Sequence, residues 1–324
     1  MAISIQPGEP EPRLVWQAAP DPRPSADEAI LQVAATAVNR ADLAQARGHY
    51  PPPPGASPIL GLEAAGTVLE VGSRVAGWQL GDRACALLSG GGYAERVAVP
   101  HEMLLRLPDS WPFERAAAVP EAWYTAFVNL ILEGQLAAGE TALIHAGASG
   151  VGTAAIQLAT QLGALPIATA GSDEKIALCR QLGAKRAINY KREEIRAAVL
   201  EATAGQGVDL ILDPVGADYL ELNLALLRPK GRLVLIGLLS GSAARLDLNV
   251  LLRQRLRLIG SVLRTRSLAE KIAITRAFRE RVWPHLLSGE LRPIVDRVFP
   301  ISQAADAHEY VRQNRSKGKV VLAI

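Results

Sequence analysis

The sequence predicts an α/β protein in which a compact, β-rich part precedes a domain built on a parallel sheet. Residues 119–264 alternate apolar strand-like segments with helical ones, the pattern of consecutive βαβ units. The predicted strands are Thr141–Ala146, Leu165–Ala170, Arg186–Ile188, Leu210–Asp213 and Arg232–Ile236. Residues 1–118 instead contain short apolar runs broken by Pro and Gly, which is typical of a small β domain.

The last part of the chain mixes helices and strands. We expect a helix over Leu268–Leu287, a short strand with a helix over Arg297–Arg312, and a terminal strand at Lys319–Ala323. Near its start, the run Pro51–Gly55 predicts a stiff, extended loop, because each proline fixes its own φ and disfavours helix in the residue before it.

A glycine-rich turn follows the first predicted strand of the parallel sheet and leads into an uncharged, apolar helix. The turn fits the pattern G-x-G-x-x-G with a serine at its middle position, and its residues are Gly147, Ala148, Ser149, Gly150, Val151 and Gly152. In this motif the first position allows a tight turn, the middle one lets the backbone approach a pyrophosphate, and the last one lets the helix pack near the strand. The helix N-terminus then faces the phosphates. The segment therefore predicts a Rossmann-type dinucleotide site.

The residues after the second predicted strand indicate which dinucleotide binds. Enzymes that use NAD place an acid there for the ribose 2′-hydroxyl, and a basic group accommodates a 2′-phosphate. Here the strand ends in Gly171 and Ser172 without an acid. With Ser172 as N-cap, Lys175 falls in the first turn of a helix, where a cation opposes the helix dipole and a 2′-phosphate would explain it. NADPH is favoured; the alternatives are a solvated Lys175 and an NAD ribose on Asp173.

Composition excludes several classes of partner. The net charge of +3 is too small for nucleic acid or an anionic membrane as main partner. The only cysteines, Cys85 and Cys179, cannot form a disulfide framework, which favours a reducing compartment. The uncharged stretch 141–172 could imitate a membrane span, but its glycines and Pro166 fit a buried βαβ unit. With no signal-peptide pattern at the N-terminus, we expect a cytoplasmic protein without membrane contact.

Several segments resemble the zinc-independent quinone oxidoreductases of the medium-chain dehydrogenase/reductase superfamily. They are AGASGVGTAAIQLA, TAGSDEK, INYK, Asn39–Gly66, Gly90–Glu95, Pro120–Phe127 and Gly318–Leu322, in the order of the family and over nearly the whole chain. The similarity is greatest to the branch with the p53-inducible quinone oxidoreductase, and zeta-crystallin is more distant. The resemblance implies a Rossmann-type domain at 119–264, inserted into a discontinuous GroES-like catalytic domain made of 1–118 and 265–324.

The resemblance also implies cofactor contacts beyond the glycine-rich turn. They are Asn39 and Thr125 beside the nicotinamide, Ser172, Lys175 and Tyr190 at the 2′-phosphate, Gly237, Leu238 and Leu263 at the carboxamide, and Lys319. Asn39 is also expected next to the acceptor oxygen. Tyr50 opens the proline loop and either donates a hydrogen bond to that oxygen or only walls the pocket, since an aromatic ring with a polar tip suits both. Asn39 and Tyr50 are thus the expected catalytic residues.

Related alcohol dehydrogenases hold a catalytic zinc, and their ligand positions are occupied here by Asn39, Leu62 and Glu121. Zinc prefers thiolate and imidazole, so this set predicts a metal-free enzyme. Without a Lewis acid a simple carbonyl is hard to reduce. A quinone accepts hydride more easily because the charge delocalises into an aromatic hydroquinone. Glu63 is expected to be a satisfied acid rather than a general base.

These inferences predict an NADPH-dependent quinone reductase acting on a small quinone, with an ortho-quinone as the expected acceptor. The enzyme alternative is an enoyl or 2-alkenal reductase. The non-enzyme alternative is a nucleotide-binding protein with an RNA-binding or structural role.

Arginines alternate at Arg253, Arg255 and Arg257. On a strand over Arg255–Val262 they would share one face, and a solvated or subunit-interface face is favoured over a nucleic-acid face. In the resembled family this strand pairs with its copy, so we expect a homodimer formed partly by edge pairing.

Overall fold

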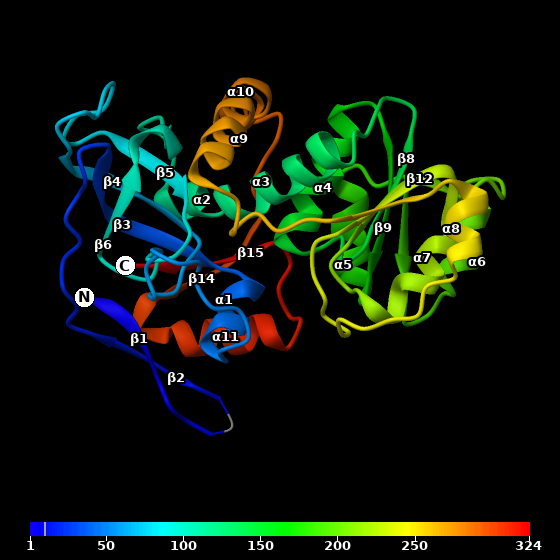
Figure 1. The fold of residues 1–324 in the computed structure, drawn as a ribbon, viewed down its shortest axis with the longest axis horizontal. Coiled ribbons are helices and arrows are strands. Elements are labelled where there is room, and N and C mark those ends of the chain that lie inside the picture. The colour runs from blue at the N-terminus through cyan, green and yellow to red at the C-terminus, as the bar shows by residue number, and fades with distance from the viewer. Residues whose placement is uncertain (10) are drawn as a thin grey trace. The chain divides into compact units, whose positions relative to one another are not determined.

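The structure is a computed structural model that describes residues 1–9 and 11–324 (Figure 1). It consists of two compact units, which we describe separately. Unit 1 comprises Met1–Tyr124 and Leu263–Ile324, and unit 2 comprises Thr125–Val262. Unit 1 carries a β-rich sheet and unit 2 a parallel sheet, which confirms the predicted fold class.

Unit 1 is organised around a seven-stranded sheet in the order β14-β15-β3-β4-β5-β7, with β6 paired to β3 and a separate antiparallel pair β1-β2. Its strands are β1 (Ala2–Gln6), β2 (Arg13–Gln17), β3 (Glu28–Val38), β4 (Glu63–Val71), β5 (Arg83–Leu87), β6 (Arg96–Pro100), β7 (Leu104–Arg106), β14 (Val295–Pro300) and β15 (Lys319–Ala323). Its helices are α1 (Arg40–Ala46), η1 (His101–Met103), α2 (Phe113–Ala117), α9 (Leu268–Arg281), α10 (Trp283–Ser288), η4 (Ile301–Gln303) and α11 (Ala304–Arg312), and α3 (Pro120–Phe127) contains the boundary with unit 2.

Strand β3 is the centre of unit 1 and is almost entirely buried. One edge of β3 pairs with β4, and the other pairs with β6 along residues 28–32 and with β15 along residues 35–38. Ala65 of β4 pairs with Ala35, and Val320 of β15 pairs with Val38. Because both partners run antiparallel to β3, the first residues of β4 and β15 lie next to the last residues of β3.

Unit 2 contains a six-stranded parallel sheet in the order β10-β9-β8-β11-β12-β13. Its strands are β8 (Thr141–Ile144), β9 (Leu165–Ala170), β10 (Arg186–Asn189), β11 (Val208–Asp213), β12 (Leu227–Leu235) and β13 (Arg257–Gly260). Its helical elements are η2 (Val128–Glu133), α4 (Gly150–Gln161), α5 (Asp173–Gln181), α6 (Ile195–Ala202), η3 (Ala217–Tyr219), α7 (Leu220–Leu226) and α8 (Leu248–Gln254). Helices cover both faces of the sheet, with α4 and α5 on one side and α7 and α8 on the other (Figure 1).

Two local expectations from the sequence are wrong. The helix expected over Leu268–Leu287 is divided into α9 and α10 at Val282, because Pro284 in the first turn of α10 has no N–H to continue the α9 hydrogen bonds. The strand expected over Arg255–Val262 spans only Arg257–Gly260. Arg253 lies in α8 and Arg255 ends that helix in the left-handed region at φ 54°, so the three arginines do not share a strand face.

Among the described residues, no helix is both long enough and apolar enough to span a membrane.

Candidate functional site

The glycine-rich turn of unit 2 follows β8, the strand where the order of the parallel sheet reverses. Such a reversal is where open α/β sheets place their ligands. Helix α4 begins at Gly150, and the Oγ of its N-cap Ser149 accepts the Gly152 N–H at 3.0 Å. A Cβ at Gly147 would lie 2.7 Å from the Cβ of Ala168, and one at Gly152 would lie 2.7 Å from the backbone of Gly147. Both glycines are therefore sterically required.

The end of β9 places three expected cofactor residues together. Ser172 is the N-cap of α5 and accepts the Lys175 N–H at 3.4 Å, so Lys175 lies in the first turn. A Cβ added to Gly171 would lie 2.6 Å from the Tyr190 hydroxyl and 2.9 Å from its ring carbon Cζ. An acid at this strand end would therefore require Tyr190 to move.

The other acid of this region, Asp173, already has two partners. Its Oδ1 accepts a hydrogen bond from Asn189 Nδ2 at 2.9 Å, and its Oδ2 forms an ion pair with Arg192 at 2.6 Å. Both oxygens are therefore directed to β10 and the residues after it, which counts against the alternative that Asp173 binds a ribose.

A buried polar network lies next to the glycine-rich turn, at the ends of β8, β9 and β11. His145, directly after β8, joins Thr169 Oγ1 at 3.1 Å through Nδ1 and Asn223 Oδ1 at 2.8 Å through Nε2. Asn223 Nδ2 donates to Asp213 at 2.9 Å, which fixes its Oδ1 as the acceptor and thus places the His145 proton on Nε2. Burial lowers the pKa of His145 to about 4, partly opposed by the Asn223 hydrogen bond. A neutral imidazole therefore ties together the ends of β8, β9 and β11.

This network predicts acid sensitivity of unit 2. Because the folded His145 has a lower pKa than an unfolded histidine, its contribution is complete above the unfolded pKa and is lost as the pH falls from there toward about 4. Replacing His145 with glutamine is expected to lower the melting temperature at neutral pH and to flatten its decline toward acid. Calorimetry over this pH range tests this, and an unchanged decline would contradict it.

Four more of the expected cofactor residues are divided between the two units. Thr125, in unit 2, accepts a hydrogen bond from Asn129 Nδ2 on its backbone oxygen at 2.8 Å. Gly237 and Leu238 follow β12 in unit 2, and the Leu238 side chain is 56% exposed, as a ligand-contacting loop requires. Leu263 is buried within unit 1.

Unit 1 contains a buried polar cluster at the meeting point of β3, β4 and β15. Asn39 follows β3, Glu63 begins β4 and Lys319 begins β15. Asn39 Nδ2 donates to Glu63 Oε1 at 2.8 Å, while Lys319 Nζ donates to Asn39 Oδ1 at 2.6 Å and to Glu63 Oε1 at 2.7 Å. The three side chains thus form a closed ring, which we call the Asn39 cluster.

The Asn39 cluster uses the hydrogen-bonding groups of its members almost completely. The second hydrogen of Asn39 Nδ2 is directed to the Ala37 carbonyl at 3.3 Å. Lys319 Nζ has a third acceptor in the Val38 carbonyl at 3.3 Å, and its residue is only 4% exposed. Asn39 and Lys319 are therefore held rigidly, and for either to donate to a ligand an existing bond must break.

Glu63 connects the cluster to α3. Its carboxylate is fully buried, and its Oε2 accepts the backbone N–H of Glu121 at 2.9 Å. Burial, and then the charge of Glu63, raise the pKa of Glu121 to about 8. The start of α3 is thus tied through its backbone to the buried Glu63 carboxylate.

A second layer of buried groups fixes the backbone around Asn39. Asp42 accepts the Asn39 N–H at 2.7 Å and the Gly61 N–H at 3.1 Å, and burial raises the pKa of Asp42 to about 6. The Tyr93 hydroxyl lies 3.0 Å from His308 Nε2, and burial lowers the pKa of His308 to about 4. His308 is therefore neutral at physiological pH.

Arg264 holds the expected catalytic Tyr50. Its guanidinium lies 5.2 Å from the centre of the Tyr50 ring and donates to the Tyr50 carbonyl at 3.2 Å and to Gln45 Oε1 at 2.6 Å. Burial raises the pKa of the Tyr50 phenol, and the charge of Glu121 raises it further. Tyr50 thus stays a protonated donor and lies within the electrostatic reach of Glu121.

The comparisons with known proteins identify the family of this chain. Residues 25–109 match the family model of the alcohol dehydrogenase GroES-like domain, and residues 150–278 match that of the zinc-binding dehydrogenases. A quinone oxidoreductase of Pseudomonas aeruginosa is 35% identical over 98% of this chain and 93% of its own length. The chain belongs to the quinone oxidoreductases of the medium-chain dehydrogenase/reductase superfamily.

Two further relatives illustrate the range of this family. The crystal structure of Escherichia coli quinone oxidoreductase complexed with NADPH matches with a TM-score of 0.88 and 29% identity over 100% of this chain and 99% of that one. A 2-haloacrylate reductase of a Burkholderia species is 31% identical over 99% of this chain and 98% of its own length.

Although one matched family model describes zinc-binding dehydrogenases, the residues of this chain at the zinc-ligand positions do not fit zinc. Leu62 is buried and offers no ligand atom, and the Asn39 carboxamide is engaged within its cluster. The Lys319 ammonium lies within 2.7 Å of Glu63, where its charge would repel a dication. Among residues 1–9 and 11–324, no three His, Cys, Asp or Glu side chains are grouped as metal ligands.

The sequence reading of Glu63 as a satisfied acid missed its position at the centre of the cluster. The available signal was a charged residue at the head of an otherwise apolar strand, in Glu63–Val71 and again in Lys319–Ala323. Two opposite charges of this kind in one small domain suggest a buried pair. Their pairing, however, depends on strand order.

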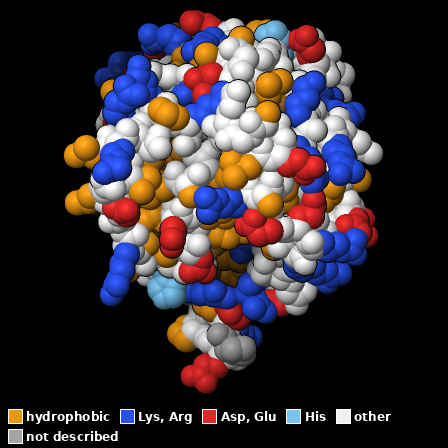
Figure 2. Space-filling view, turned by 90° about the vertical axis from the view of Figure 1, so that its right-hand side faces the viewer, with side chains coloured by type: hydrophobic (Ala, Val, Ile, Leu, Met, Phe, Trp, Pro, Cys, Tyr) orange, Lys and Arg blue, Asp and Glu red, His pale blue; other side chains and the backbone are white. Residues whose placement is uncertain are grey.

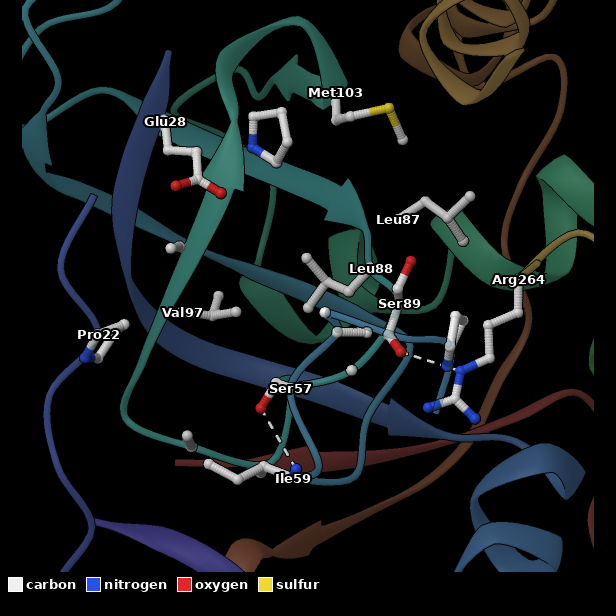
Figure 3. Close-up of a pocket in the computed structure, with 18 of the residues that line it drawn as sticks. Pro22, Glu28, Ser57, Ile59, Leu87, Leu88, Ser89, Val97, Met103 and Arg264 are labelled. Atoms are coloured by element: carbon white, nitrogen blue, oxygen red, sulfur yellow. Dashed lines mark hydrogen bonds between the residues drawn. The ribbon is translucent and has the colours of Figure 1, made fainter. Parts of the chain in front are cut away.

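Unit 1 also contains a cavity of about 710 Å³, and Arg264 is one of the residues that line it (Figure 3). Leu88, Val97 and Met103 contribute apolar walls. Its two central cations are already paired within the protein: Arg264 Nε donates to the Ser89 carbonyl at 2.9 Å, and Lys271 Nζ donates to Ser89 Oγ at 2.7 Å. We therefore assign no ligand to this cavity.

Proposed function

We propose that the chain is an NADPH-dependent, zinc-independent quinone reductase with an ortho-quinone as its preferred acceptor. The observation that carries the cofactor assignment is the end of β9, where Tyr190 occupies the space of a Gly171 side chain and Lys175 lies in the first turn of α5. An acid for a ribose 2′-hydroxyl would have to displace the Tyr190 side chain there, and a 2′-phosphate suits the lysine. NADPH in the Escherichia coli relative supports the same choice.

The chemistry of the site supports a metal-free reaction. When bound, NADPH supplies the hydride, and the protein binds and orients the reactants. In place of metal ligands, the chain has the rigid Asn39 cluster, in which the charge of Lys319 is balanced by that of Glu63. Arg264 fixes the loop that carries Tyr50. A quinone needs no Lewis acid, because its reduced form delocalises the negative charge. The quinone oxidoreductase name of the Pseudomonas aeruginosa relative supports this acceptor class.

The first experiment is NADPH oxidation with an ortho-quinone, compared with NADH and repeated after treatment with a chelator. We expect turnover that prefers NADPH and is insensitive to the chelator. Equal turnover with NADH would contradict the assignment of the 2′-phosphate site, and loss after chelation would contradict the metal-free reaction.

An enoyl or 2-alkenal reductase is the second candidate, because the 2-haloacrylate reductase relative also spans the chain. Faster turnover of an α,β-unsaturated ketone than of an ortho-quinone would favour it. An RNA-binding role is less well supported: basic and acidic side chains are interspersed on the face drawn in Figure 2 instead of forming a basic patch.

We also propose a homodimer in the cytoplasm. Strand β13 is the edge of the unit 2 sheet, and an edge of this kind pairs readily with a second copy. Exposed leucines at 248 and 252 lie on the preceding helix α8 and would be covered in such a dimer. Light scattering at micromolar concentration is expected to give the dimer mass, and a monomer mass would contradict the proposal. Cys85 and Cys179 are free and buried, which suits a reducing compartment.

A further inference from the structure

Quinone reduction consumes a proton in addition to a hydride. Hydride addition leaves a negative charge on an oxygen of the product, and this oxygen must then form an O–H bond. A group of the protein near the Asn39 cluster that holds a transferable proton would supply it and would raise the rate by general acid catalysis.

Most polar groups of the cluster are unsuited to this task. Both hydrogens of Asn39 Nδ2 are directed to acceptors of the protein, and Lys319 Nζ has three acceptors. Glu63 accepts hydrogen bonds from Asn39, Lys319 and the Glu121 N–H, so both of its carboxyl oxygens already act as acceptors within the protein, and it is ion-paired with Lys319. Glu63 is therefore not placed to donate a hydrogen bond to a ligand.

Glu121 has the opposite environment. It contributes a backbone N–H to Glu63, but among the described residues none donates a hydrogen bond to its carboxyl group. The ammonium of Lys319 is already paired with Glu63 at 2.7 Å, and the nearby cations of Arg264 and Lys271 donate to Ser89 and other acceptors. Of the two carboxyl groups only that of Glu63 has a bonded cation, an arrangement in which the other carboxyl group more readily keeps its proton.

All elements packed around Glu121 contribute charged or titratable groups that face it. They are Glu63 from β4, Lys319 from β15, Asp42 from α1, Tyr50 from the loop after α1, and Arg264 and Lys271 at the start of α9. Burial and the Glu63 charge outweigh the cations and raise the pKa of Glu121 to about 8. The group is thus protonated at neutral pH, and it is only partly buried, so water can reach it.

We propose that Glu121 is the catalytic acid that gives this proton to the reduced acceptor. The inference rests on the proposed quinone reductase function. As the product oxygen forms its O–H bond, the O–H bond of the Glu121 carboxyl breaks and leaves a carboxylate. Water then returns a proton to Glu121, so that each cycle consumes one proton and one hydride and needs no further reactant.

The test compares the wild type with Glu121→Gln, which keeps the size of the side chain but cannot release a proton in this way. With NADPH and an ortho-quinone, wild-type kcat is expected to fall in the alkaline range as Glu121 ionises. The variant should lose this pH dependence and about 100-fold in kcat at neutral pH, with unchanged NADPH affinity. Glu201→Gln, at an exposed glutamate of α6, is the matched control and should behave as the wild type.

A second measurement is independent of turnover. The infrared difference spectrum between wild type and Glu121→Gln should show the C=O band of a protonated carboxyl at neutral pH, which disappears at alkaline pH. Absence of this band, or a variant with wild-type kcat and pH profile, overturns the proposal. A wild type that shows the band but reduces neither quinone nor enone overturns the proposed function, and the acid role with it.

Discussion

Replacing Lys319 with methionine is expected to lower the free energy of unfolding by about 3–5 kcal/mol, because it leaves the fully buried Glu63 carboxylate without its cation. The substitution also removes the donor to Asn39 Oδ1. The carboxamide of Asn39 then keeps only its two Nδ2 hydrogen bonds and is held less rigidly, so we expect a loss of reductase activity in the protein that remains folded. Denaturant titration and steady-state kinetics measure the two effects.

The charge explanation has a specific control. In the double variant Glu63→Gln with Lys319→Met both charges are gone, so much of the lost stability should return, as replacing both members of a buried pair is often nearly neutral. Lys317→Met, two residues earlier and not in the cluster, is the matched single substitution. Equal destabilisation by the substitutions at 317 and 319 would show that the buried pair has no special role.

Replacing Lys175 with alanine is expected to weaken NADPH binding about 10- to 100-fold and to leave NADH binding nearly unchanged. A hydrogen bond between two charged groups contributes roughly 1.5–3 kcal/mol, and only NADPH carries the phosphate. Fluorescence titration with both cofactors measures the difference. The difference between the losses of NADPH and NADH affinity should be largest at low salt, because this part of α5 is near solvent and salt screens charges there.

Lys185→Ala is the control for this prediction. Lys185 is exposed and directly precedes β10, at the opposite end of that strand from Tyr190. It should leave the affinities for both cofactors unchanged. An equal loss for NADPH and NADH in Lys175→Ala would remove Lys175 from the 2′-phosphate site and weaken the cofactor assignment.

The sequence alone was sufficient for features whose causes are local. The strand, glycine-rich turn and helix around 141–161 follow from adjacent residues, and the structure places Ser149 and Ser172 as helix N-caps as the motif requires. Strand β9 and strand β15 have the predicted bounds, because each is a short, mostly apolar segment. The α/β class and the family were predicted for the same reason.

The tertiary structure decided what depends on distant residues. Glu63 and Lys319 are separated by 256 positions, and only the antiparallel pairing of β3 with both β4 and β15 brings them to Asn39. Periodicity predicts a strand but not its neighbours, so neither the ion pair nor the protonation of Glu121 could be read beforehand. The left-handed backbone at Arg255 was also unpredicted, since it is imposed where α8 must end before β13. Burial and strand order, which act only in the folded chain, thus determine the chemistry of this site.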